Sequence, residues 1–128
     1  MSFSRTVCGM LLPKKVQSAI DALLGPSGKS DLALRVAVFE KTRTSAGEIP
    51  AAQLRALVEK IDARPWTVND EDFIKLRQAG YSEDQIFELT VAAAAGAGVR
   101  RFEAGLRAIE ATCDKVSAAL SVGGPDAA

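Results

Sequence analysis

The chain has no histidine and only two cysteines among its 128 residues. Without histidine, the sequence excludes His-based general acid–base catalysis, His-containing triads and His ligands for a metal. Cys8 and Cys113 lie near opposite ends of the chain, without the spacing of a disulfide framework or a metal site. We therefore expect no metal and no cofactor, and no residue stands out as catalytic.

Net charge and long apolar runs are also missing. The 16 Lys and Arg residues balance 16 Asp and Glu, whereas a nucleic-acid-binding protein needs a basic excess. The longest uncharged mid-chain run, residues 89–99, is far shorter than the ~20 residues that span a bilayer. Residues 6–12 are too few for a secretory signal. We expect a cytoplasmic protein that binds neither nucleic acid nor membrane.

The composition that remains is that of a globular protein. Hydrophobic residues make up 48% of the chain and charged residues 25%. We expect one helical domain over residues 1–122, with residues 1–12 as a loose arm and 123–128 as a disordered tail. Zero net charge also removes repulsion between copies and so favours self-association.

Apolar residues recur at helical spacing and predict an all-α bundle of about six helices. The first is expected between Pro13 and Gly25, and the third between Pro50 and Arg64. Between them, residues 31–44 alternate like a strand, but Ser30 as an N-cap and Asp31 in the first turn favour a helix with Arg35 outside. The alternating residues are Leu32, Leu34, Val36 and Val38, whereas the apolar residues that fit a helix are Leu32, Val36 and Phe39.

A short fourth helix is expected after Thr67 as N-cap, with Phe73, Ile74 and Leu76 in its core. The fifth should begin at Glu83 and break around Gly98. A sixth would then follow with apolar residues three and four positions apart. These are Phe102, Leu106, Ile109, Cys113, Val116 and Leu120.

The start of the fifth helix is the best defined point in the chain. Gly80 can adopt the left-handed conformation that closes the preceding helix. Ser82 and Gln85 form the pattern of a capping box, and Tyr81 and Ile86 occupy the flanking staple positions.

Two further segments resemble anion sites. Residues 25–30, Gly-Pro-Ser-Gly-Lys-Ser, end like a phosphate loop, but Leu23 stands in place of its first Gly and the segment lies between two expected helices. We expect a plain turn there. The basic residues Arg100, Arg101 and Arg107 could hold an anion near Gly98, although salt bridges with Glu103 and Glu110 are the simpler expectation.

A strip of small residues follows the start of the fifth helix, and it lets another backbone come close. We expect the strip to allow tight packing of helices. Because the helix has apolar residues on two faces, we expect this packing at an interface between copies of the chain. The interface residues we nominate are Ala92, Ala94, Ala95, Gly96 and Gly98.

The segment from Gln78 to Ala111 resembles the C-terminal part of AhpD-like, or carboxymuconolactone decarboxylase-like, proteins. The likeness lies in Ala-Gly-Tyr-Ser-Glu-Asp-Gln-Ile-Phe-Glu-Leu, the Ala-rich run and the amphipathic helix behind it. It implies an AhpD-like helical bundle that assembles as a trimer or hexamer.

The same resemblance implies a redox site with a Cys-x-x-Cys pair, a His and an acidic residue. Counting back from Ala79, the two Cys positions hold Pro65 and Val68, the His position holds Asp72, and the acidic position holds Gln53. Thiol peroxidase activity is therefore not expected. Trp66 either plugs the vacated space or lines a small-molecule pocket, and the candidate pocket residues are Gln53, Trp66, Asp72 and Tyr81.

Two functions follow. The first is a non-catalytic, oligomeric interaction or assembly protein with a degenerate active site. The alternative is a decarboxylase-like enzyme, or a binding protein, for a small carboxylic acid or lactone. In the enzyme, Asp72 would act as a base only if burial raised its pKa.

Overall fold

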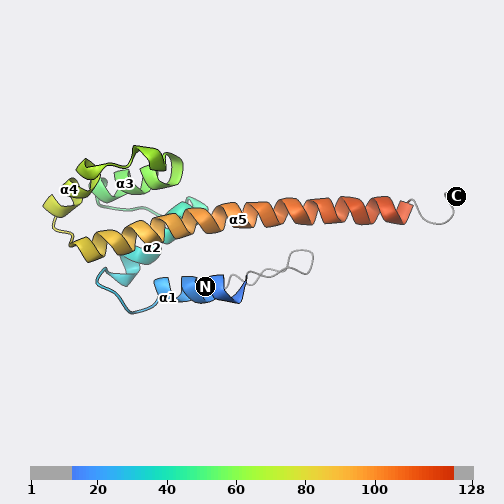
Figure 1. The fold of residues 1–128 in the computed structure, drawn as a ribbon, viewed down its shortest axis with the longest axis horizontal. Helices are drawn as coiled ribbons and strands as arrows, with labels where there is room; N and C mark the ends of the chain where they lie inside the picture. The colour runs from blue at the N-terminus through green and yellow to red at the C-terminus, as the bar shows by residue number, and fades with distance from the viewer. Residues whose placement is uncertain (1–12, 123–128) are drawn as a thin grey trace.

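The computed structural model describes residues 13–122, which form five α-helices and one 3₁₀ turn and contain no strand (Figure 1). The expected arm and tail lie outside these residues. The elements are α1 (Lys14–Leu23), α2 (Leu32–Thr44), α3 (Ala52–Ala63), η1 (Pro65–Thr67), α4 (Asp70–Gln78) and α5 (Glu83–Val122). No helix in this part of the chain is long and apolar enough to cross a membrane.

Helix α5 is the axis of the molecule. Its N-terminal half packs against the other helices, most extensively against α2, and its C-terminal half extends beyond them (Figure 1). The expected break at Gly98 is wrong, so five α-helices replace the expected six. A single helical Gly costs only ~1 kcal/mol relative to Ala, and the alanines around it favour helix.

The core lies between α2, α3, α4 and the first half of α5. Its largest fully buried side chains include Phe39, Leu54, Leu57, Leu76 and Leu89. Of the expected core residues of α4, Leu76 is buried and Phe73 is partly buried against the core, but Ile74 is half exposed. The expectation for Ile74 is therefore wrong.

Gly96 allows α2 and α5 to approach closely. A Cβ atom built there would lie 2.0 Å from Thr42 Oγ1 and 2.3 Å from the Phe39 carbonyl oxygen. Ala92 and Gly96 are both buried within the chain itself, whereas Ala94 and Gly98 are exposed and Ala95 is partly buried. The buried side of the small-residue strip therefore packs within the chain itself, whereas its other side is exposed.

The capping box that the sequence predicts at the start of α5 is confirmed. The Ser82 hydroxyl accepts from the Gln85 N–H (3.2 Å), and the Gln85 side chain accepts from the Ser82 N–H (2.9 Å). Gly80 has φ of 104°. Its N–H donates to the Arg77 carbonyl and the Tyr81 N–H to the Leu76 carbonyl, which is the Schellman arrangement.

Two other helix starts differ from expectation. The N-cap of α4 is Asn69 rather than Thr67: Asn69 and Asp72 form a reciprocal capping box, and the Thr67 hydroxyl donates to the Arg64 carbonyl instead. Helix α3 begins at Ala52, two residues after Pro50. Both shifts leave the order of elements unchanged.

Residues 32–44 form a helix, so the strand alternative is excluded. Its start differs from expectation, because Ser30 makes no cap bond and Asp31 occupies the N-cap position. Arg35 was expected outside, yet it is only 2% exposed. Both differences arise from the loop before α2, in which Ser30 binds Glu88 and Arg35.

Candidate functional site

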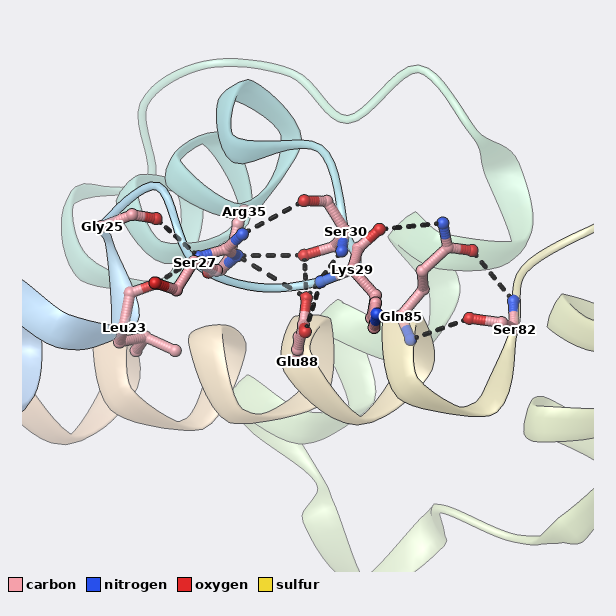
Figure 2. Close-up of polar contacts among 9 residues, drawn as sticks. All are labelled: Leu23, Gly25, Ser27, Lys29, Ser30, Arg35, Ser82, Gln85 and Glu88. Carbon is pink, nitrogen blue, oxygen red and sulfur yellow. Dashed lines mark hydrogen bonds and ion pairs between the residues drawn. The ribbon is translucent and has the colours of Figure 1, made fainter.

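The loop between α1 and α2 wraps around two charged side chains, Arg35 from α2 and Glu88 from α5 (Figure 2). Ser30 lies between them. Its hydroxyl donates to Glu88 Oε2 (2.5 Å) and accepts from Arg35 Nε (2.9 Å). One loop residue therefore joins the guanidinium to the carboxylate.

The loop backbone holds the carboxylate of Glu88. The N–H of Lys29 donates to Oε1 and that of Ser30 to Oε2, each at 2.7 Å. Gly28 makes this approach possible, because its φ is 130° and a Cβ there would lie 3.0 Å from both carboxylate oxygens. A side chain at this position would be strained and would push against the carboxylate.

The loop carbonyls hold Arg35. Its Nη1 donates to the carbonyls of Leu23 (2.7 Å), Gly25 (3.0 Å) and Ser27 (3.1 Å), and its Nη2 to that of Ser30 (3.1 Å). These bonds satisfy a buried cation that would otherwise cost several kcal/mol. Arg35 therefore fixes the end of α1 and the whole loop against α2.

The electrostatics of this Arg35–Glu88 cluster favour the charged carboxylate. The bond from the Ser30 hydroxyl, followed by the two backbone N–H groups and the charge of Arg35, lowers the pKa of Glu88 to about 2. A carboxylate so stabilised is a poor proton acceptor near neutral pH. The cluster is suited to hold the loop in place, since each charge is already bound by the chain.

The four nominated pocket residues have different surroundings. Gln53 is exposed on the first turn of α3, and Trp66 in η1 is 78% exposed, so it does not plug the interior. Tyr81 lines a cavity of about 300 Å³ with Ser30, Asp31, Leu34, Ala79, Gly80, Gln85 and Leu89. That cavity includes none of the other three nominated residues.

Asp72 is bound by its neighbours. Its carboxylate accepts from Lys60 Nζ (2.8 and 3.0 Å) and from the Asn69 N–H (3.0 Å). The bond from Lys60, and then that from Asn69, lowers the pKa of Asp72. Asp72 was expected to act as a base only if burial raised its pKa, but its pKa is lowered.

Two of the basic residues near Gly98, Arg100 and Arg101, bind groups of Asp62 and Thr42, which were not their expected partners. Arg100 donates to both carboxylate oxygens of Asp62 (2.7 and 3.1 Å) and to the Thr42 carbonyl (2.8 Å), and the Asp62 contact raises the pKa of Arg100. Arg101 donates to the Asp62 carbonyl (2.8 Å). Glu103 pairs instead with Arg43 at 3.1 Å.

Sequence reasoning missed the Arg35–Glu88 cluster. The available signal was the Gly28-Lys29-Ser30 turn, which does present two N–H groups to an anion, but that anion is a carboxylate of the same chain. Within residues 13–122, no group of three His, Cys, Asp or Glu side chains is placed to hold a metal. Comparison with family models, with curated proteins and with solved structures found no match to this chain.

Proposed function

We propose that this chain is a non-catalytic assembly protein that works as a homo-oligomer, on a helical bundle similar to AhpD-like proteins. The observation that carries the proposal is the exposed apolar side of α5. Ile86 and Leu89 are buried in the core, whereas Phe87 is 68% exposed on the other face of the same helix. A second apolar face needs a partner, because water contact with it is unfavourable.

The state of the charged groups supports a role without catalysis. Glu88 and Asp72, which have lowered pKa values, are each bound by several donors of the chain. Neither has the raised pKa that a general base near neutral pH requires. Pro65 and Val68, at the places where AhpD-like proteins carry their Cys pair, cannot do thiol chemistry.

The cavity beside Tyr81 favours a second candidate, a binding protein for a small carboxylic acid or lactone. Its lining combines polar groups of Ser30, Asp31 and Gln85 with apolar Leu34 and Leu89. A few polar groups in a partly apolar hollow are typical of small-molecule sites.

A thermal-shift screen with small carboxylic acids and lactones separates the two functions. A ligand of the folded protein at 100 times its Kd would add about 2.7 kcal/mol to the free energy of unfolding. The assembly function predicts no such shift, together with a mass above that of one chain in light scattering. A saturable shift that is lost in a Tyr81→Ala variant would favour the binding protein instead.

A further inference from the structure

One exposed apolar stripe runs along nearly the whole of α5. Its large members are Phe87, Val91, Phe102, Ile109, Val116 and Leu120, which are between 37% and 72% exposed. We call it the α5 stripe. At 3.6 residues per turn these positions fall in one narrow sector of the helix, and no charged residue of α5 after Asp84 shares that sector.

The stripe turns only slowly around α5, because its spacing is close to the 3.6 residues per turn of an α-helix. Phe87, Gly98, Ile109 and Leu120 recur every eleven residues, and an eleven-residue repeat corresponds to about 3.67 residues per turn. The stripe therefore continues from the part of α5 that packs on the other helices into the part that extends beyond them (Figure 1).

The size of the stripe suits a dimer contact. Residues 87–120 rise ~1.5 Å each, so the stripe measures about 50 Å by 10 Å, on the order of 500 Å² per copy. That is near the upper end of the apolar patches that monomers expose, about 300–600 Å². Two such faces together reach the roughly 1,000 Å² that a specific interface needs.

The order of large and small residues indicates how two stripes fit. The small members, Ala94, Gly98 and Gly105, are exposed, and nothing lies within 4 Å of a Cβ built at Gly98 or Gly105. If two copies run in opposite directions and are centred between residues 103 and 104, Ile109 meets the partner's Gly98 and Phe102 meets the partner's Gly105. In a parallel pair, each glycine would face the same glycine and leave a gap, which costs packing energy.

We propose that two copies of this chain pair antiparallel through the α5 stripe, with Ile109 and Phe102 of each copy over the partner's Gly98 and Gly105. This inference rests on the proposed assembly function and specifies its partner and its interface. In the pair, the half of α5 that extends beyond its own bundle covers the exposed stripe on the bundle of the other copy.

The first test compares two arginine substitutions on the same part of α5. Ile109→Arg places a charge in the stripe, whereas Ala104→Arg places it at an exposed position on another side of the helix. In light scattering, we expect wild type and Ala104→Arg to show twice the chain mass, or an even multiple, and Ile109→Arg to show half of that. Circular dichroism should be unchanged, because Ile109 lies outside the buried core.

The outcomes separate the inference from the function it rests on. A wild-type protein that is monomeric at all concentrations would overturn both. An oligomer that Ile109→Arg leaves intact would overturn the α5 stripe as its interface, while the assembly function would stand.

The second test concerns direction. In a background with Cys8→Ser and Cys113→Ser, Gly98→Cys and Ile109→Cys are made as separate proteins and oxidised alone and as a mixture. The antiparallel pair predicts disulfide-linked dimers only in the mixture, because each new thiol faces the other substituted position. Cross-links within either protein alone would show a parallel pair, and a dimer with no cross-link in the mixture would refute the register.

Discussion

Glu88 illustrates how one carboxylate fixes a loop that lies 58 residues away in the sequence. Its donors are Lys29 and Ser30, and its neighbour Arg35 binds the rest of the same loop. The energy of such charge-assisted bonds is about 1.5–3 kcal/mol each, more than that of neutral ones. The loop conformation therefore depends on a residue outside it.

We expect Glu88→Gln to lower the free energy of unfolding at pH 7 by roughly 1.5–3 kcal/mol, since the charge-assisted bonds from the loop are weakened. The pKa of Glu88 is lowered from 4.5 to about 2 by folding, so its contribution is fully present above pH 4.5 and lost as the pH falls toward 2. Urea melts should show the difference between wild type and variant shrinking from pH 5 to pH 2. Glu59→Gln, exposed on α3, is the control, and a pH-independent difference for Glu88→Gln would contradict this account.

Gly96 and Gly98 provide a matched pair on one helix. Gly96→Ala should destabilise the fold by about 1–3 kcal/mol or more, because the added methyl would meet the backbone of α2. Gly98→Ala should stabilise it by roughly 0.5–1 kcal/mol, since nothing lies within 4 Å of the new atom and alanine favours helix. Denaturant melts in dilute solution, where the copies are apart, give both values. Equal effects at the two sites would show that α2 does not cross α5 at Gly96.

The start of α5 was predicted correctly from the sequence, because its capping chemistry is local. The capping bonds of Ser82 and Gln85 join residues three positions apart, and the N–H of Gly80 donates to the carbonyl of Arg77, also three positions away. The start of α4 was misplaced by two residues, because Thr67 and Asn69 are both good caps and only the tertiary structure chooses Asn69.

Ser82→Ala tests the cap directly. The substitution removes the acceptor for the Gln85 N–H and should lower stability by about 0.5–2 kcal/mol. Ser121→Ala, at an exposed position near the other end of α5, should be close to neutral. If the two variants melt at the same denaturant concentration, the Ser82 cap contributes nothing to stability.

The sequence predicted the arrangement of the whole molecule less well than it predicted local structure. The helical class and the two apolar faces of α5 followed from residue spacing, which is a local signal. The burial of Arg35 did not, because its partners are carbonyls whose position depends on the fold of residues 23–30. The continuity of α5 through Gly98 did not follow from residue spacing either. Packing and the helix propensity of the neighbouring alanines outweigh the low helix propensity of this one glycine.

At this scale the central claim is that α5 uses one face to build the subunit and the opposite face to join another subunit. Ala92 and Gly96 belong to the first face, and Ala94 and Gly98 to the second. The two sets are only two residues apart, so substitutions can separate their roles.

Light scattering of an Ala94→Arg variant tests this claim most directly, with Ala111→Arg at an exposed position outside the stripe as its control. We expect Ala94→Arg to have the mass of one chain and to keep its helical circular dichroism, while wild type and Ala111→Arg remain assembled. Loss of helicity in Ala94→Arg would show that this face belongs to the subunit core. If Ala94→Arg has the same mass in solution as the wild type, the face is not an interface. Either result would contradict the account.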